Sequence, residues 1–365
     1  IGRVFYEFAQ SDPLAWAARR GDYDFALLSL ANSPDKVHRI CVKLVKDLGK
    51  SLFSGTQFEK NYVSVGMAVF KSGDDIYSVL ASADMALRSA QLEGGNWVHS
   101  YSTEQLDRRQ IRGGVRWRTF LQGILERRAV TLFFQKQVTS EDMSVTGYEV
   151  LSRVADDSGF IEASIFLPMA SRFGLSANFD RLVVDSTLKS LKLTNTFDST
   201  ELTINLFVES LLDDSFVVWL VQQLSVHKEH NKQIIFEITE GSLSRHFDSL
   251  SPVIEQIASL GCSWCVEHVG NPSADLNYLF NLPIKRIKLA KSLVNNIDSK
   301  QQKWLFIESL INSCHLAGVD VFGEGVEREQ EWRALVDLGI DGGQGFWIEE
   351  PLEEVSRLPK QRLQD

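Results

Sequence analysis

The chain has 365 residues, of which 44% are hydrophobic and 24% charged, and its formal net charge is −10. This composition is ordinary for folded domains, and the length allows two hydrophobic cores, so a largely disordered chain is excluded. The acidic balance argues against a protein whose whole surface binds nucleic acid, although a local basic patch remains open. No run in the sequence approaches the roughly 18–20 apolar residues that span a bilayer.

Residues 1–102 form the first predicted domain. The segments 25–32 ("FALLSLAN") and 62–70 ("YVSVGMAVF") are typical of strands, and residues 74–91 carry apolar side chains at helical spacing after an acidic start. The glycines of "EGGN" that follow predict the end of this helix. The chain begins without Met inside a helix-like stretch, so we expect it to be part of a longer protein.

Residues 103–128 form a predicted connector with a local charge of +4, because seven arginines face three acidic residues. The simplest interpretation is a solvated helical linker that is broken at Gly113–Gly114. The alternative is a segment that binds a polyanion, since clustered arginines suit phosphates and the neighbouring Trp117 suits a stacked base. The candidate RNA-binding residues are Arg108, Arg109, Arg112, Arg116 and Arg118.

Residues 129–365 alternate short apolar strands with amphipathic helical segments. The predicted strands are 130–137, 145–154, 202–208, 233–239, 262–269, 284–290, 319–325 and 342–348. Eight strands with intervening helices predict an α/β fold, a (β/α)8 barrel, in which chemistry takes place at the carboxyl ends of the strands. The polar residues at or near these ends are Glu149, Asn205, Glu240, Glu267, His268, Lys288, Glu324 and Gln344.

The four cysteines, Cys41, Cys262, Cys265 and Cys314, show no spacing typical of a disulfide framework and favour a reducing compartment. Cys262 and Cys265 form a CxxC pair, but no second pair completes four zinc ligands. Because side chains alternate along a strand, these two point to opposite faces. We therefore predict that they pack as small apolar residues.

Several short motifs of the chain, in the expected order, resemble the GGDEF–EAL family, whose domains make and linearise cyclic di-GMP. In the second domain these are "YEVLSR", "INLF", "FEITE", "IKRIKLAKSLV", "FGEGVE" and "GGQGFWIEEP"; in the first, "RRGDYDF", "VGMAVF" and "ADMALRSAQLEGGN". The resemblance implies a barrel of the EAL type, preceded by a partial, N-terminally truncated α+β domain that is GGDEF-like.

The resemblance also implies where an active EAL enzyme would hold two divalent ions. The matching positions are Glu149, Asn205, Glu240, Lys288, Glu324, Glu327 and Gln344. By motif, Glu149, Asn205 and Glu240 match the ligands of the first ion. Lys288 matches the lysine near the attacking water. Two such ions neutralise phosphate charge and activate the water in enzymes of this kind.

The chain departs from the family at the second ion. Glu267 and His268 replace the paired aspartates that bridge the ions, and Ala290 replaces an acidic residue. Magnesium demands hard oxygen ligands in tight octahedral geometry, whereas imidazole suits softer ions, and His268 cannot bridge two ions. We therefore predict a dismantled site without catalytic residues, metal or other cofactor. Two alternatives remain open: a softer ion such as zinc on Glu267–His268, and His268 as a general base in different chemistry.

The first domain departs from its own family motif in the same way. The positions concerned are Gly21, Asp22, Tyr23, Asp24 and Phe25. Gly21 keeps a glycine, but Asp22 replaces the second glycine and Tyr23 replaces the aspartate. Nucleotide chemistry is therefore not expected in this domain either.

The join "GGVRWRTFLQGILERR", together with the double degeneracy, is similar to one branch of the family, the CsrD/MshH family. This resemblance implies the cytoplasmic part of an inner-membrane regulator whose anchor lies upstream of Ile1. Such a regulator is non-enzymatic and promotes RNase E-dependent decay of the small RNAs that sequester CsrA. Implied partners are EIIA of the glucose phosphotransferase system, small RNA and the RNase E machinery.

Two other functions remain open at this stage. One is a receptor that binds cyclic di-GMP without cutting it, with Glu149, Arg153 and Gln344 as candidate contacts. The other is a residual cyclic di-GMP phosphodiesterase.

Overall fold

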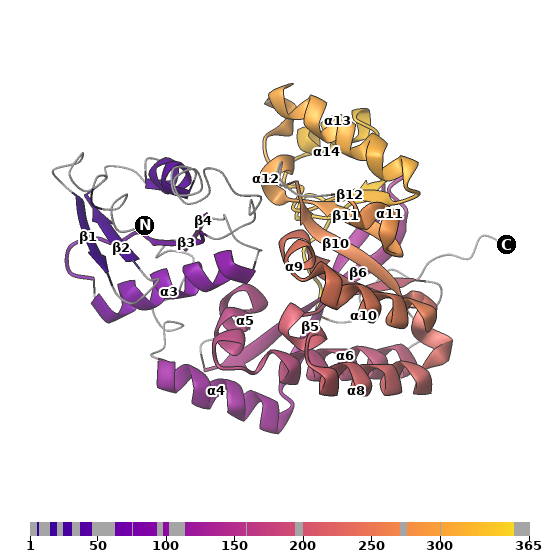
Figure 1. The fold of residues 1–365 in the computed structure, drawn as a ribbon, viewed down its shortest axis with the longest axis horizontal. Helices are drawn as coiled ribbons and strands as arrows, with labels where there is room; N and C mark the ends of the chain where they lie inside the picture. Colours follow the sequence, from indigo (N-terminus) through magenta and orange to yellow (C-terminus); the bar gives the residue numbers. More distant parts are fainter. Residues whose placement is uncertain are drawn as a thin grey trace. The chain divides into compact units, whose positions relative to one another are not determined.

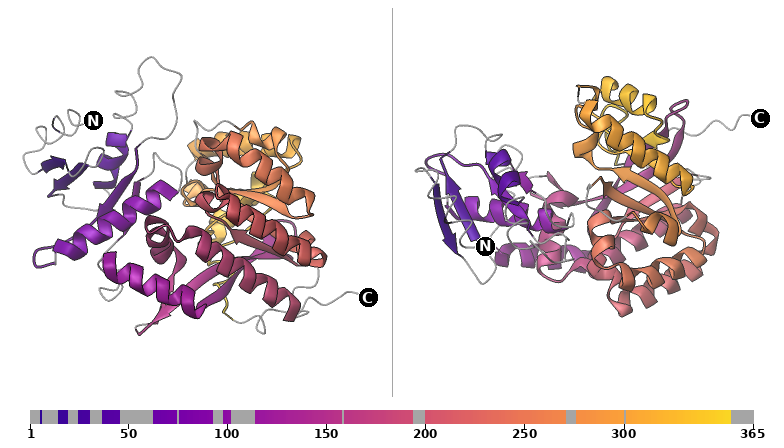
Figure 2. Two further views of the ribbon diagram at one scale, coloured as in Figure 1. Left: turned by 60° about the horizontal axis from the view of Figure 1, so that its bottom comes forward. Right: turned by 45° about the horizontal axis from the view of Figure 1, so that its top comes forward.

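The computed structural model divides the chain into two compact units, Ile1–Trp117 and Arg118–Asp365, which are described one at a time. The structure describes residues 6, 15–19, 25–30, 37–45, 63–74, 76–92, 98–101, 114–157, 159–193, 200–270, 276–299 and 301–353. Figure 1 labels the elements of both units, and Figure 2 shows the same ribbon from two further sides. No helix among these residues is both long and apolar enough to cross a bilayer.

The first unit contains two small sheets and a long helix. Strand β1 (Ala15–Arg19) pairs antiparallel with β2 (Phe25–Ser29), and β3 (Val65–Ala68) pairs parallel with β4 (Val98–Tyr101). Helix α3 (Ile76–Leu92) makes the crossover that a parallel pair requires, and it packs on both β3 and β4. The strands and the helix predicted here from the sequence are confirmed, with shorter strands.

The close approach of α3 to β3 depends on Gly66. A Cβ atom at this position would lie 2.1 Å from the backbone nitrogen of Leu87, so no larger residue fits without moving the helix. The facing side of α3 is lined by the buried residues Met85, Ala86 and Ala90.

Helix α4 (Gly114–Arg127) follows the predicted glycine break and is amphipathic. Trp117, Leu121 and Ile124 are buried at helical spacing, whereas Arg116 and Arg118 are exposed. The suggestion that Trp117 stacks on a nucleic-acid base is therefore wrong, because its side chain has no exposed surface. The helix uses the indole as an apolar anchor and leaves the arginines in solvent.

The second unit is a closed barrel. Its strands are β5 (Val130–Thr139), β6 (Val145–Asp156), β8 (Glu201–Asn205), β9 (Ile234–Thr239), β10 (Ser263–Val269), β11 (Ile284–Leu289), β12 (Asp320–Gly323) and β13 (Gly342–Gly343). The sheet order is β5-β13-β12-β11-β10-β9-β8-β6-β7, and a further pairing of β5 with β6 closes it. The short β7 (Gly159–Glu162) only extends β6. The predicted (β/α)8 barrel is thus confirmed.

One strand departs from the ideal barrel. Strand β5 runs antiparallel to both of its neighbours, β6 and β13, while the remaining neighbours in the barrel are parallel. The reason is the connection: β5 and β6 are joined by a short hairpin, and a parallel pair needs a crossover of a dozen residues or more.

Helices cover the outside of the barrel in Figure 1. They are α5 (Ala163–Arg172), α6 (Ser176–Leu193), α7 (Val208–Leu211), α8 (Asp214–Val226), α9 (Glu240–Arg245), α10 (Phe247–Ser259), α11 (Tyr278–Asn281), α12 (Lys291–Val294), α13 (Gln301–Leu316) and α14 (Glu329–Asp337), with 3-10 turns at Lys228–Gln233 and Ile297–Ser299.

The core of this unit lies between strands and helices. Outward-facing strand residues such as Ile204, Phe236 and Val266 are buried in one continuous apolar cluster. Since side chains alternate along each strand, the neighbouring residues face the barrel interior. These inward positions include Glu237 and Cys265, which lie side by side in the register of β9 and β10. The barrel interior therefore carries polar side chains, and these side chains form the candidate site.

Candidate functional site

Lys288 lies at the centre of the polar barrel interior. Its Nζ atom is 2.6 Å from Oε2 of Glu149 and 2.7 Å from Oε2 of Glu237, and its side chain has no exposed surface. Burial by itself lowers the pKa of this amine, but the two carboxylates outweigh burial and hold the pKa well above its usual value. The residue is a buried ammonium on β11 that is shared by Glu149 of β6 and Glu237 of β9.

Glu149 has the richest set of partners. Its Oε2 also accepts a hydrogen bond of 2.6 Å from Nε2 of Gln344, and its Oε1 accepts one of 2.8 Å from Nδ2 of Asn205. Burial opposes ionisation, but Lys288 and these hydrogen bonds prevail and lower the pKa of Glu149. The group is therefore a fully hydrogen-bonded carboxylate.

Glu237 is more deeply buried than Glu149. Burial raises its pKa to about 7, although Lys288 acts in the opposite direction. The Sγ atom of Cys265 donates to its Oε1 at 3.2 Å. Burial also raises the pKa of the Cys265 thiol, so Cys265 is a neutral donor.

The two glutamates of the motif "FEITE", Glu237 and Glu240, have different roles in the structure. The sequence prediction places Glu240 among the ligands of a first metal ion, but in the structure Glu237 takes that position beside Glu149 and Lys288. Glu240 is the first residue of α9 and holds the segment after β10 instead. Its carboxylate accepts 2.9 Å from the hydroxyl of Tyr278 and 3.3 Å from the backbone nitrogen of Gly270.

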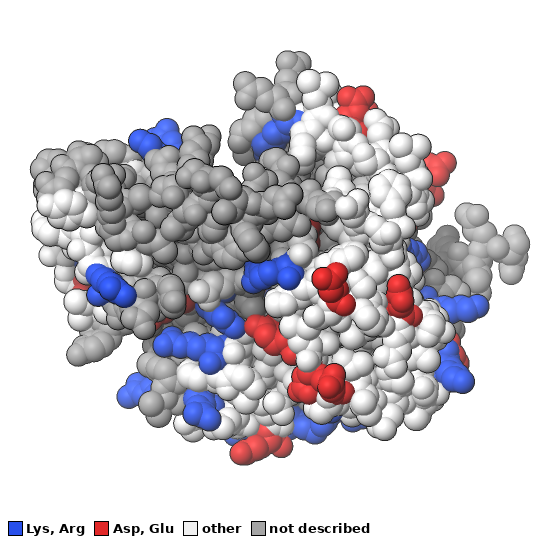
Figure 3. All heavy atoms as spheres, in the orientation of Figure 1, with Lys and Arg blue, Asp and Glu red and all other residues white. Residues whose placement is uncertain are grey.

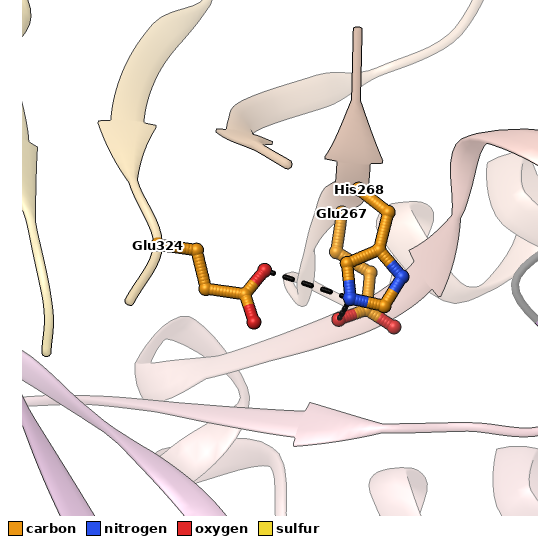
Figure 4. Close-up of side chains that lie close together, drawn as sticks. All are labelled: Glu267, His268 and Glu324. Carbon is orange, nitrogen blue, oxygen red and sulfur yellow. Dashed lines mark ion pairs between the residues drawn. The ribbon is translucent and has the colours of Figure 1, made fainter. Parts of the chain in front are cut away.

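A second cluster lies at the ends of β10 and β12, where Glu267, His268 and Glu324 point toward one another (Figure 4). Nε2 of His268 is 3.8 Å from Oε2 of Glu267 and 3.6 Å from Oε2 of Glu324. Burial is the main reason that the pKa of Glu267 rises to about 8, with His268 acting in the opposite direction. His268 has a φ of 55°, an uncommon conformation for a residue other than glycine.

Two further mapped positions do not join these clusters. Ala290 is buried and its backbone nitrogen donates 2.9 Å to the carbonyl of Val269, so it ties strand ends together and offers no ligand. Glu327 pairs with Lys291 at 2.7 Å on the surface.

The polar interior continues below the mouth of the barrel. Gln344 accepts a hydrogen bond of 2.8 Å from Gln137, and Gln137 accepts one of 3.1 Å from Arg286. Arg286 also donates 3.0 Å to Glu201, and its guanidinium lies 3.8 Å from the ring centre of Phe322. Sequence reasoning named Gln344 but missed Gln137, Glu201 and Arg286, although alternation along each strand places them inward.

Cys262 packs in the apolar cluster as predicted, whereas Cys265 faces the polar barrel interior and donates to Glu237. All four cysteines are free and buried. Burial raises the thiol pKa of Cys262 to about 12 and that of Cys314 to about 12. Neutral, enclosed thiols of this kind neither ligate zinc readily nor exchange disulfides.

The remaining predicted positions are only partly described. Gly21, Asp22, Tyr23 and Asp24 lie outside the described residues, as do Arg108, Arg109 and Arg112. Phe25 is the first residue of β2.

The described part of the connector is basic and exposed. Arg116, Arg118 and Arg127 lie on exposed positions of α4. Lys and Arg side chains gather in Figure 3 where α4 lies in Figure 1.

Known proteins resemble this chain in the barrel and also in the residues that precede it. Residues 117–351 match the family described as the EAL domain. The chain is 29% identical over 358 residues to the RNase E specificity factor CsrD of Escherichia coli strain K12, covering 97% of this chain and 54% of that protein. It is 24% identical to the bifunctional diguanylate cyclase/cyclic di-GMP phosphodiesterase MucR of Pseudomonas aeruginosa, covering 92% and 49%. The chain thus spans about half the length of these relatives.

One solved structure matches nearly the whole chain, and another matches about two thirds of it. The S helix–GGDEF–EAL structure of Vibrio cholerae LapD, bound to c-di-GMP, matches with a TM-score of 0.76 at 20% identity and covers 95% of this chain and 83% of its own. The FimX EAL domain of Pseudomonas aeruginosa, bound to c-di-GMP, matches with a TM-score of 0.60 at 24% identity and covers 66% and 97%. The resemblance to CsrD-type GGDEF–EAL proteins is confirmed.

Proposed function

The chain belongs to the EAL domain family, and we propose that it is a non-enzymatic regulatory adaptor that promotes RNase E-dependent decay of CsrA-sequestering small RNAs. Similarity to the RNase E specificity factor CsrD along 97% of the chain supports the regulatory role. The observation that carries the non-enzymatic part is His268, whose imidazole lies beside Glu267 and Glu324 where the family resemblance implies an aspartate that bridges two ions.

The residues present do not fit the pair of hard divalent cations that the family resemblance implies. Glu149, Asn205 and Glu237 keep oxygen atoms that suit one such ion, and Lys288 matches the lysine that the family resemblance places near the attacking water. At the neighbouring position, His268 presents an imidazole where magnesium requires an oxygen ligand. The family's two-ion hydrolysis therefore lacks its ligand set in this chain.

An adaptor acts by contact, and we propose two contacts. The barrel with its outer helices binds EIIA of the glucose phosphotransferase system, as the CsrD/MshH resemblance implies. The connector arginines contact small RNA, which the exposed positions of Arg116 and Arg118 support. We also propose that these domains are the cytoplasmic part of an inner-membrane protein.

Two measurements on the purified chain test this proposal. Incubation with cyclic di-GMP and Mg²⁺ or Mn²⁺ should give no linear product, and linear product would contradict the non-enzymatic assignment. Immobilised chain should capture EIIA in its unphosphorylated state and not in its phosphorylated state. Equal capture of both states, or of neither, would contradict the proposed partner.

Arg153 favours one alternative, a receptor that binds cyclic di-GMP without cutting it. It lies on the same face of β6 as Glu149, with its guanidinium 4.0 Å from the ring centre of Phe133 and 3.3 Å from Glu162. Its side chain is 23% exposed and could meet a phosphate. Calorimetry separates the two functions: micromolar binding that Arg153→Ala abolishes would favour the receptor, and no binding would favour the adaptor.

A further inference from the structure

We propose that helix α8 binds a second copy of this chain, so that the two α8 helices pack antiparallel about a two-fold axis at Gln222. This inference does not depend on the adaptor function, because its test measures only the association of the chain with itself. It starts from a row of exposed residues on α8 that lie four positions apart. This row is called the α8 ridge and consists of Asp214, Val218, Gln222 and Val226.

The α8 ridge lies opposite the face of the helix that packs into the core. That inner face consists of apolar residues that are also four positions apart and have no exposed surface: Phe216, Leu220 and Leu224. Because residues at i and i+4 share one face of a helix, the two rows lie on opposite sides of α8. The helix is on the outside of the barrel unit in Figure 1, so the ridge faces solvent.

The outer face of α8 lacks the charges that a solvent-facing helix normally carries. Its two ridge valines, Val218 and Val226, are 58% and 68% exposed. No residue from Ser215 to Val226 is Asp, Glu, Lys or Arg, although 24% of the chain is charged. A surface helix normally presents charged and polar residues on the side away from the core, whereas the centre of a protein interface is depleted in charge. The composition of the ridge therefore points to a surface that another protein molecule covers.

The spacing of the α8 ridge makes it complementary to itself when one copy is reversed. Val218 and Val226 lie four positions before and four positions after Gln222. In a two-fold pair centred on Gln222, Val218 of one copy therefore lies beside Val226 of the other, and the two Gln222 side chains meet on the axis. A side-chain amide carries both a donor and an acceptor, so these two can bond to each other. Two-fold contacts require such a self-complementary surface.

The two ends of α8 carry opposite charges, which favours a second copy as the partner. Asp214 is the first residue of the helix, and Lys228 begins the 3-10 turn that follows it. Both are exposed, and neither makes an ion pair in the part of the chain that the structure describes. In the antiparallel pair each Asp214 lies near Lys228 of the other copy, and the helix dipoles also oppose each other. A parallel pair would bring like charges together.

The dimer should be weak and should dissociate on dilution. A stable interface buries about 1,200–2,000 Å² in total, which is more than a single helix from each copy provides.

Sedimentation equilibrium of the purified chain over a range of concentrations tests the proposal, and we expect a reversible monomer–dimer equilibrium. Val218→Glu should make the chain monomeric at every concentration, because it places a carboxylate against Val226 of the other copy. The matched control is Leu305→Glu, the same kind of change at a residue of α13 that is 77% exposed, and it should leave the equilibrium unchanged. A natural chain that stays monomeric would overturn the proposal and leave the α8 ridge to a different protein. Loss of the dimer in Leu305→Glu but not in Val218→Glu would place the contact on α13 and overturn the proposal as well.

A charge exchange tests the antiparallel arrangement. Asp214→Lys and Lys228→Glu should each weaken self-association about tenfold, since either change sets like charges together at both ends of the contact. An equimolar mixture of the two variants should recover the natural affinity, because each Asp214→Lys chain then meets a Lys228→Glu chain with opposite charges at both ends. Circular dichroism verifies that each variant is folded. A mixture that associates no more tightly than the single variants would overturn the antiparallel pairing.

Discussion

The Nζ atom of Lys288 lies 2.7 Å from Oε2 of Glu237, and neither side chain has any exposed surface. An isolated charge in such a place is strongly unfavourable, so each group depends on the other and on Glu149 for its charged state. This triad replaces the branched apolar residues that usually fill a (β/α)8 barrel. The barrel therefore depends on polar pairing at its centre.

Replacing Lys288 by Met should destabilise the barrel by about 3–5 kcal/mol, because two buried carboxyl groups lose their cation. Urea unfolding measures this change. The matched control is Lys291→Met, which removes a lysine that is 51% exposed and paired with Glu327, and it should cost less than about 1 kcal/mol. Equal losses in the two variants would contradict the role of the buried triad.

Stability should fall as the pH rises toward 8, and Asp180 should account for part of this fall. Burial raises the pKa of Asp180 from 3.8 to about 8, so the folded chain keeps a proton that the unfolded chain releases. The stabilisation is fully present below about pH 4 and is lost as the pH rises through the folded-state pKa.

The variant Asp180→Asn isolates this contribution. Its side-chain oxygen can still accept the 3.0 Å hydrogen bond from the backbone nitrogen of Phe207, but it does not titrate. Urea unfolding at pH 5 and pH 8 should show a smaller loss of stability in the variant than in the natural chain. Glu237 and Glu267, whose pKa values are also raised, keep part of the pH dependence in both proteins. An identical loss of stability in the two proteins would show that Asp180 does not contribute to the pH dependence.

The strands could be predicted because their residues alternate between two environments. Glu237 was nevertheless missed, since "FEITE" offers two glutamates and the sequence prediction chose Glu240. The strand ends at Thr239 and Glu240 opens a helix, so only Glu237 stands in the inward row with Asn205 and Cys265. Counting alternate positions back from the end of the strand would have identified it.

Chain connections explain two other differences. The segment between the first two predicted barrel strands, residues 138–144, is too short for a parallel crossover, so the antiparallel pairing of β5 and β6 could have been predicted. The predicted strand 342–348 is only two residues long in the structure, Gly342–Gly343, and no sequence pattern indicates this. Its next residues bond to Val326 instead, through the carbonyl of Gln344 and the amide of Trp347.

Replacing Tyr278 by Phe should cost about 1–3 kcal/mol, because the buried carboxylate of Glu240 loses a hydrogen bond of 2.9 Å. The same change should speed hydrogen exchange at the amide of Gly270, which donates to the other oxygen of Glu240. Urea unfolding and exchange measured by NMR test both effects. Normal stability together with unchanged exchange would show that Glu240 does not hold this segment.

Replacing the five connector arginines, Arg108, Arg109, Arg112, Arg116 and Arg118, by Ala should flatten the salt dependence of RNA binding. Each neutralised phosphate contributes about 0.7–0.9 to the slope of log affinity against log salt, so the slope should fall by about 3.5–4.5 units. Arg116→Ala with Arg118→Ala should remove about 1.5 units, since both side chains are exposed on α4.

The control for this experiment is Lys291→Ala with Arg333→Ala, which removes two exposed basic side chains of the barrel that pair with Glu327 and Glu329. Filter binding over a range of salt concentrations measures all slopes on one RNA and on a scrambled sequence. Because phosphates carry no base identity, the loss should be equal for both RNAs. An unchanged slope in the five-fold variant would discard the connector as an RNA contact and leave protein binding as the route by which the adaptor acts.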